Sequence, residues 1–158
     1  MSASLPDGLG GAQPPAGGWW LACRVVTAEW PAAVRAGIEA DLRRVAGRLR
    51  TLSPAQLAAA VEGHPSRAAG GRAVAQLLVV AAQGIEERSA PDEPRWRQLP
   101  ELSPFAVGDQ VAVTGHDLLA LLGSVGPQQP VWTPGTRRTA VEVLTDAADH
   151  LASLRRVI

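Results

Sequence analysis

The chain has 158 residues, enough for one domain with a hydrophobic core of its own. Its apolar fraction of 46% and charged fraction of 19% are typical of a soluble globular protein. The formal net charge of zero argues against a nucleic-acid-binding protein, which needs a basic surface to contact phosphates, and gives no electrostatic reason to bind an anionic membrane.

The single cysteine, Cys23, cannot form an internal disulfide, which favours a reducing compartment. Its apolar surroundings, LACRVV, predict a buried side chain rather than a catalytic thiol. The N-terminus lacks the basic and apolar regions of a signal peptide, and no uninterrupted apolar run reaches the roughly 18–20 residues of a membrane span. We therefore expect a cytoplasmic protein without a membrane partner.

The N-terminal 18 residues are rich in glycine and proline, which predicts a disordered tail over 1–18 and one folded domain over 19–158. From Pro31 to about Arg50, apolar residues recur every three or four positions, the period of an amphipathic helix. The predicted buried stripe consists of Val34, Ile38, Leu42, Val45 and Leu49.

The sequence SPAQ (53–56) has the pattern of a capping box, with a serine cap, a proline at the first helical position and a glutamine that reaches back. It predicts a short helix that ends at Gly63, followed by a loop over 62–71.

A third helix is expected from Arg72 to about Arg88, and its polar strip would be Gln76, Gln83 and Glu87.

Residues 89–103 contain three prolines and no period, so we expect a long connection, with Trp96 packed back onto the body. SPFA (103–106) repeats the serine–proline start and predicts a fourth helix to about Leu122. TPGT (133–136) is interpreted as the start of the last helix, which runs to near Ile158. The face of this helix would be Val141, Leu144, Ala148 and Leu151.

Four substantial helices, one short helix, long loops and no alternating strand pattern predict an all-α fold, a helix bundle. The fourth helix contains the adjacent pair His116–Asp117. At about 100° per residue, His116 turns toward solvent while Thr114 lies near the middle of the apolar face, with Gln110 and Asp117 at its edge. His116 is therefore expected to be solvated, and Asp117 to need a partner such as an arginine.

No motif for metal or nucleophilic chemistry is present. His64, His116 and His150 do not have the spacing of a metal site, and the chain has no glycine-rich phosphate loop and no nucleophile elbow. We therefore predict no metal site.

The helix order and three stretches resemble the DinB-like superfamily, in particular its actinobacterial mycothiol-dependent maleylpyruvate isomerase group. One of the three is the final amphipathic helix, which fits in place and length. RAVAQLLVVAAQGIEER (72–88) is similar to that family's second bundle helix, and VAVTGHDLLALL (111–122) to its third helix, with the pattern E-x-x-x-H-x-x-D-L. The resemblance spans roughly residues 30–158 and implies a four-helix bundle with a divalent metal between helices.

The resemblance also implies where the metal ligands would lie, and each position departs from the pattern. The second-helix histidine falls at Val80, the third-helix glutamate at Gln110 and its histidine at Thr114, whereas the following Asp-Leu matches Asp117-Leu118. Valine cannot bind a metal, and neutral glutamine and threonine are poor ligands for a divalent ion. The resemblance therefore implies a bundle that has lost its metal.

Two functions remain open from the sequence. The first is a metal-free member of the mycothiol-dependent isomerase and transferase group, either a weak enzyme or a binder, with mycothiol as a possible cofactor by resemblance only. Its small-molecule pocket between helices would involve Gln110, Thr114, Asp117, Arg72 and Trp132. Alternatively, the Thr114 hydroxyl bonds back to the carbonyl of Gln110 and lines no pocket.

The second function is a helical interaction or regulatory module without small-molecule chemistry, as a monomer or homodimer. Exposed tryptophans would mark its partner surface, because tryptophan is enriched at interface hot spots. The candidates are Trp19, Trp20, Trp30 and Trp132. Packing of these side chains within the fold is the alternative.

Overall fold

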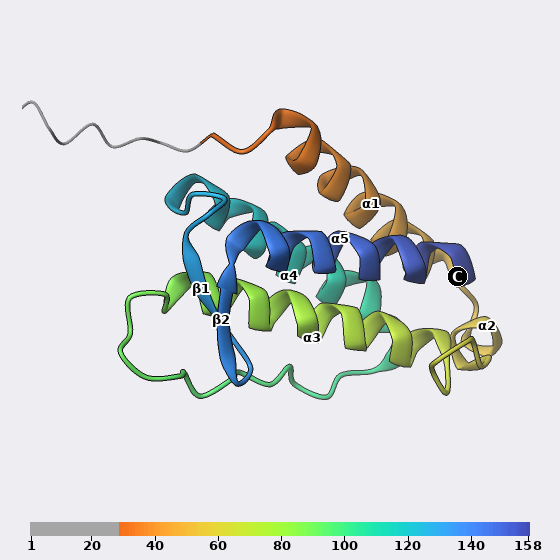
Figure 1. Ribbon diagram of the computed structural model, residues 1–158. Helices are drawn as coiled ribbons and strands as arrows, with labels where there is room; N and C mark the ends of the chain where they lie inside the picture. Colours follow the sequence, from red (N-terminus) through yellow and green to blue (C-terminus); the bar gives the residue numbers. More distant parts are fainter. Residues whose placement is uncertain (1–28) are drawn as a thin grey trace, which may run out of the picture.

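A computed structural model of the chain describes residues 29–158 (Figure 1). The predicted tail over 1–18 and its boundary, as well as Trp19, Trp20 and Cys23, lie outside the described residues. The described part is mostly helical, with five α-helices, two short 3₁₀ helices and a two-stranded antiparallel sheet. The elements are α1 (Ala32–Thr51), α2 (Pro54–Ala58), α3 (Arg67–Glu86), η2 (Pro104–Ala106), α4 (Val107–Leu121), η3 (Leu122–Ser124), β1 (Pro130–Thr133), β2 (Thr136–Thr139) and α5 (Ala140–Val157).

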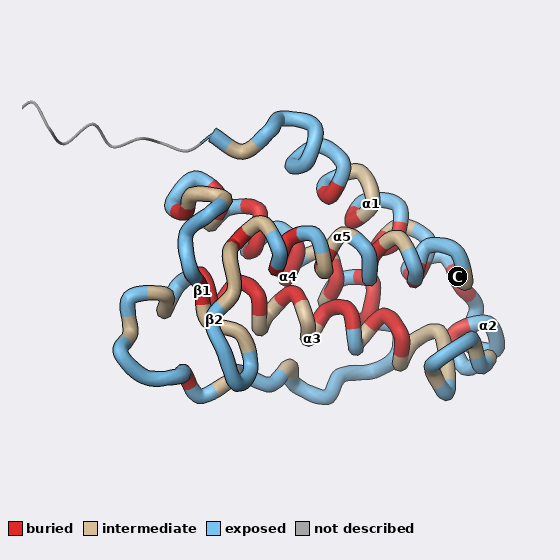
Figure 2. Tube along the Cα trace, in the orientation of Figure 1, coloured by how far each residue is buried: buried red, intermediate tan, exposed pale blue. Residues whose placement is uncertain are grey.

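The long helices α1, α3, α4 and α5 pack around one apolar core, with α3 in contact with both α4 and α5 (Figure 1). Buried positions concentrate on the sides of these helices that face one another, as Figure 2 shows. The largest fully buried side chains come from all four helices and β1: Val45, Leu49, Leu78, Ile85, Val111, Leu118, Val131, Leu144 and Leu151, with Leu57 of α2. The predicted predominantly helical fold is confirmed at this level.

The predicted stripe of α1 is buried over most of its length but not at its start. Ile38, Leu42, Val45 and Leu49 are buried, whereas Val34 is 37% exposed. The first turns of α1 lie at the edge of the molecule, where Figure 2 shows exposed positions. The apolar period therefore identified the helix. Which of its apolar residues are buried depends on where the neighbouring helices pack against it.

The capping box of α2 is confirmed. The Ser53 hydroxyl accepts a hydrogen bond from the Gln56 amide at 3.3 Å, and the Gln56 side chain accepts one from the Ser53 amide at 2.9 Å. The predicted end at Gly63 is wrong, because the helix ends at Ala58.

The predicted loop over 62–71 is wrong at its end, because α3 begins at Arg67, where Ser66 caps it by accepting a bond from the Ala69 amide. Two adjacent glycines hid this start, since glycine is a poor helix former. The packing explains Gly71: an added Cβ there would lie 2.7 Å from the Val107 side chain of α4.

The polar strip of α3 binds the backbone of the long connection that follows. Gln83, only 2% exposed, donates to the Arg95 carbonyl and accepts from the Arg97 amide, each at 2.8 Å. Gln76 donates to the Arg97 carbonyl at 2.7 Å and accepts from the Leu99 amide at 2.8 Å. Two glutamines seven residues apart thus hold an extended segment along α3 (Figure 1).

The fourth predicted helix is confirmed as η2 followed by α4. The Ser103 hydroxyl accepts a bond from the Phe105 amide, and the chain then continues directly into α4. Trp96, expected to pack onto the body, is half-buried, and its indole N–H donates within the connection to Glu93 at 2.7 Å.

The interpretation of TPGT as a helix start is wrong, and so is the absence of strands. Residues 130–139 form a hairpin, β1 paired antiparallel with β2, with Pro134 and Gly135 at the two central turn positions. The φ of Gly135 is +78°, a conformation that favours glycine and that a type II turn requires at this position. By local rules, TPGT fits two structures: a helix start with Thr133 as the cap and Pro134 at the first helical position, and a turn with Pro134 and Gly135 at its centre.

The last helix, α5, begins at Ala140 with a second capping box. Thr139 accepts from the Glu142 amide, and the Glu142 carboxylate accepts from the Thr139 amide at 2.8 Å and from its hydroxyl at 2.7 Å. Of the predicted face, Leu144 and Leu151 are buried, whereas Val141 and Ala148 are half-buried. The remaining buried positions of α5 are Ala140, Val143, Ala147 and Leu154.

Glu142→Gln is expected to destabilise the protein more at pH 7 than at pH 3. The hydrogen bonds from the hydroxyl and the amide of Thr139 lower the pKa of Glu142 from its ordinary value of 4.5. A lowered folded-state pKa stabilises the protein above the unfolded value, and this stability is lost as the pH falls through the folded value. Urea midpoints at both pH values measure the effect.

The control for Glu142→Gln is Asp149→Asn, which removes an exposed carboxylate seven residues further along α5. This control should change the urea midpoint less than Glu142→Gln does at pH 7. An equal difference between the wild type and Glu142→Gln at both pH values would contradict the contribution of the Glu142 charge.

Within the described residues, one helix, α3, is long and apolar enough to cross a membrane by length and composition, with a mean hydropathy of 1.3 over 18 residues. In that window, 56% of the residues are buried within the protein. Core helices of soluble proteins pass the same test, so the finding is weak evidence for a span.

Candidate functional site

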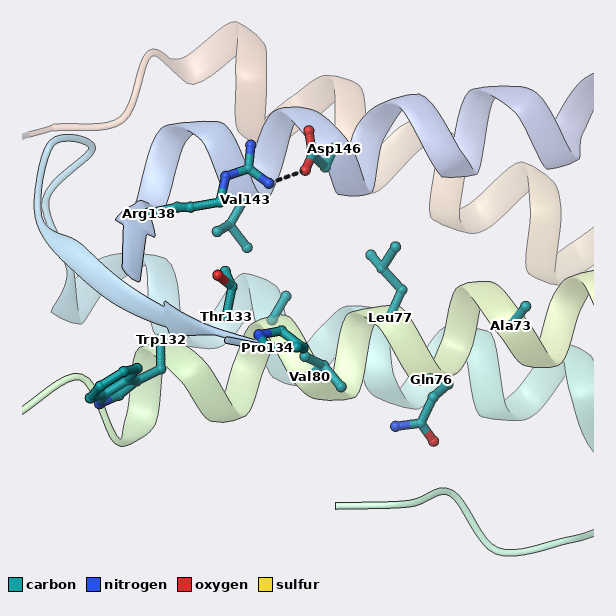
Figure 3. Close-up of a pocket in the computed structure, with 11 residues that line it drawn as sticks. Ala73, Gln76, Leu77, Val80, Trp132, Thr133, Pro134, Arg138, Val143 and Asp146 are labelled. Atoms are coloured by element: carbon teal, nitrogen blue, oxygen red, sulfur yellow. Dashed lines mark hydrogen bonds and ion pairs between the residues drawn. The ribbon is translucent and has the colours of Figure 1, made fainter. Parts of the chain in front are cut away.

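A cavity of about 380 Å³ lies between α3, α5 and the hairpin (Figure 3). Its walls are mostly apolar: Leu77 and Val80 come from α3, Val143 comes from α5, and Pro134 comes from the hairpin turn. The remaining lining residues are Ala73, Gln76, Ala81, Trp132, Thr133, Arg138 and Asp146. The size and the apolar lining are those of a small-molecule site.

One side of this cavity is charged. Arg138 at the end of β2 donates from Nη1 to Oδ2 of Asp146 on α5 at 2.5 Å, across the cavity from Leu77 and Val80 (Figure 3). The bond to Asp146 raises the pKa of Arg138, so the guanidinium stays charged. The two side chains are 37% and 48% exposed, which means that the charged side of the cavity reaches solvent.

The hairpin wall is held in place from its other side. The Trp132 indole N–H donates to the Ala90 carbonyl at 3.1 Å, and the Gly135 amide donates to the Glu93 carboxylate at 3.0 Å. Arg137 stacks over the Trp132 ring with its guanidinium carbon 4.1 Å from the ring centroid, which adds a cation–π contact. The hairpin is therefore a fixed wall, tied to the connection after α3.

The seam of α4, expected to offer polar side chains to a pocket, is closed. Thr114 is buried, and its hydroxyl donates to the Gln110 carbonyl at 2.8 Å, which is the alternative that lines no pocket. Gln110 is half-buried, and its side-chain amide donates to the Pro100 carbonyl at 3.1 Å. Thr114 lines neither the cavity beside the hairpin, nor the hollow between α1 and α4, nor the one at the start of α3.

Asp117 and His116 are both exposed and line a separate hollow of about 530 Å³ between α1 and α4. The expectation for His116, a solvated side chain, is confirmed. Asp117, predicted at the edge of the apolar face, is exposed and lines this hollow. The ion pair with α1 is made instead by Asp109, which accepts from Arg50 at 2.7 Å.

Arg72 and Gln110 are the two predicted site residues that share a hollow, one of about 320 Å³ at the start of α3. Arg72 lies 3.6 Å from the exposed carboxylate of Glu101. Trp132 lines the cavity between α3, α5 and the hairpin instead. The five predicted residues are thus divided among three hollows and the core, and they do not form one site.

The charged side of the main cavity was not predicted from the sequence. Arg138 lies in a segment read as helix, and Asp146 lies on the polar side of the predicted last helix. The three positions that the resemblance assigns to metal ligands are also separated: Val80 lines this cavity, whereas Gln110 lines another hollow and Thr114 is buried.

Among residues 29–158, no group of three or more histidine, cysteine, aspartate or glutamate side chains could hold a metal ion. Comparison with known proteins adds no relative: no family model, no curated protein and no solved structure matches this chain.

Proposed function

We propose that this chain is a cytoplasmic, metal-free, DinB-like four-helix bundle that binds a small molecule in the cavity between α3, α5 and the hairpin. The cavity carries the proposal, because it joins apolar walls to a fixed pair of charged groups within one space of about 380 Å³. The order of the four long helices supports the bundle. Val80, the counterpart of the family's second-helix histidine, lines this cavity.

The proposal is one of binding, and no catalytic step is assigned. Mycothiol is the ligand that the resemblance implies, and it belongs in any screen beside smaller apolar compounds. The proposed ligand contacts are Leu77, Val80 and Val143 for an apolar body, with Arg138 and Asp146 for a polar group.

Leu77→Trp is expected to abolish small-molecule binding while the fold is kept. Leu77 is half-buried on the cavity wall, so a larger side chain can extend into the hollow instead of into the core. We expect binding to weaken at least tenfold, measured by NMR titration of methyl-labelled protein with mycothiol and a library of small aromatic compounds.

The control for Leu77→Trp is Val113→Trp, which enlarges an exposed side chain on α4 outside this cavity. This control should leave the affinities unchanged. Equal binding by the wild type and Leu77→Trp would contradict the proposed site.

The second candidate function is a helical interaction module. It is favoured by the apolar side chains of Leu102, which is 49% exposed, and of Phe105, which is 60% exposed and lies beside α2. The tryptophan surface does not support it in the described part of the chain, because Trp30 and Trp132 are half-buried and donate to the carbonyls of Val125 and Ala90. Self-association in sedimentation analysis that Phe105→Ser removes, with no ligand found for the cavity, would favour this candidate.

A further inference from the structure

The cavity between α3, α5 and the hairpin has room for a group of small-molecule size and opens to solvent at its charged side. At about 30 Å³ per water molecule, 380 Å³ corresponds to roughly a dozen small groups. A single substituted aromatic ring or a branched aliphatic chain has this size.

The polar side chains of the α3 and hairpin walls are already hydrogen-bonded. Gln76 uses its amide nitrogen on the Arg97 carbonyl and its oxygen on the Leu99 amide. The Thr133 hydroxyl donates to the Thr136 carbonyl at 2.9 Å. These walls therefore offer mainly carbon surface to a ligand, and the body of the ligand must be apolar.

The charged side of the cavity has bonding capacity left. The ion pair uses Nη1 of Arg138 and Oδ2 of Asp146, and a guanidinium has five N–H donors while a carboxylate has two acceptor oxygens. A ligand that reaches this pair can therefore accept from Arg138 and donate to Asp146 at the same time.

The charges of this pair select against an ionised head group. A carboxylate attracted by Arg138 would also be repelled by Asp146, and by the nearby Glu142, whose carboxylate bonds to Thr139. An ammonium group attracted by Asp146 would be repelled by Arg138. A neutral group with one acceptor and one donor satisfies both partners without either repulsion.

From this arrangement we infer that the ligand is a neutral molecule with an apolar body of about ten heavy atoms and one head group, such as a primary carboxamide, that accepts from Arg138 and donates to Asp146. The inference rests on the proposed function, because it names the chemistry of the same cavity.

Three probes of matched shape test the inference: 4-ethylbenzamide, 4-ethylbenzoate and 4-ethylbenzylamine. Each is titrated into methyl-labelled protein at pH 7, and the shifts of the methyl groups of Leu77, Val80 and Val143 are followed by NMR. We expect the amide to bind at least fivefold more tightly than either charged probe. Tighter or equal binding of the benzoate or the benzylamine would overturn the inference.

Variants of the ion pair test the inference through changes in the order of the three affinities, so the result does not depend on how tightly any one probe binds. Asp146→Asn removes the carboxylate that is hydrogen-bonded to Arg138 and should shift the preference toward the benzoate by about tenfold. Arg138→Gln should shift the preference toward the benzylamine. Asp149→Asn, an exposed change on the same helix, is the control and should keep the wild-type order.

The outcomes separate the inference from the proposed function. Binding of the probes in an order that neither charge variant changes would overturn the head-group inference and leave the cavity a binding site. Failure of all three probes to shift the cavity methyl groups would overturn the head-group inference, and failure of mycothiol and the compound library to shift them as well would overturn the proposed function.

Discussion

Gly84→Ala is expected to destabilise the protein by about 3 kcal/mol and to separate the hairpin from α3. Gly84 is buried on α3 directly under β1, and an added Cβ would lie 2.0 Å from the backbone oxygen of Trp132. A side chain could turn away from such a contact, but a strand backbone can relieve it only by moving as a unit. Overpacking against a rigid neighbour typically costs about 1–3 kcal/mol, and backbone contact puts this site at the upper end.

The structural consequence of Gly84→Ala is local. The hairpin is held to the connection by Trp132 and Gly135, so these bonds break if β1 moves away, whereas the contacts of α3 with α4 do not involve the hairpin. We expect a melting temperature lower by roughly 10 °C. The NMR shifts of residues 130–139 should change together, and the cavity between α3, α5 and the hairpin should no longer bind ligand.

The control for Gly84→Ala is Gly47→Ala, in the middle of α1. A Cβ at Gly47 would meet nothing within 4 Å, so the only effect is the better helix propensity of alanine. This variant should be more stable than the wild type by about 0.5–1 kcal/mol. If Gly84→Ala were as stable as Gly47→Ala, β1 would not lie close enough to α3 for a Cβ at residue 84 to contact the Trp132 backbone.

The parts of the fold that could be predicted from sequence are those decided by local chemistry. Ser53 with Gln56 formed the expected capping box, and the apolar period of α1 identified its buried side. Such features depend on residues three or four positions apart, whose contacts the helix itself creates.

The parts that failed depend on contacts between distant segments. TPGT fits a helix start and a turn equally well by local rules, and the hairpin is stabilised by its contacts with α3 and with the connection, around Gly84, Ala90 and Glu93. Gly71 lowers helix propensity, yet α3 runs through it because α4 packs there. In both places tertiary packing overrides the local preference.

The candidate site could not be predicted because the hairpin was not. Arg138 and Asp146 are eight residues apart and would lie about 12 Å apart along one continuous helix, too far for an ion pair. They meet because the chain leaves β2 and turns into α5 between them. For Thr114, the sequence left two alternatives, and the bond to the Gln110 carbonyl selects the one without a pocket.

Gln83→Leu is expected to destabilise the protein by about 2 kcal/mol, although leucine fits a buried position on α3. Gln83 is 2% exposed and makes three hydrogen bonds, to the Arg95 carbonyl, the Arg97 amide and the Glu87 carboxylate. Leucine keeps most of the volume but leaves these groups without their partner, and each unpaired group costs about 1–3 kcal/mol where water cannot replace it. Arg95 and Arg97 are exposed, so water recovers part of the loss.

The effect of Gln83→Leu should be greatest along the connection after α3. We expect hydrogen exchange of the Arg97 amide to accelerate at least tenfold, and the urea midpoint to fall, with a smaller loss for Gln76→Leu because Gln76 is only half-buried. Gln128→Leu, an exposed change before β1, should stay within about 0.5 kcal/mol of the wild type. If Gln83→Leu were as stable as Gln128→Leu, the hydrogen bonds of Gln83 to Arg95 and Arg97 would not be what holds the connection along α3.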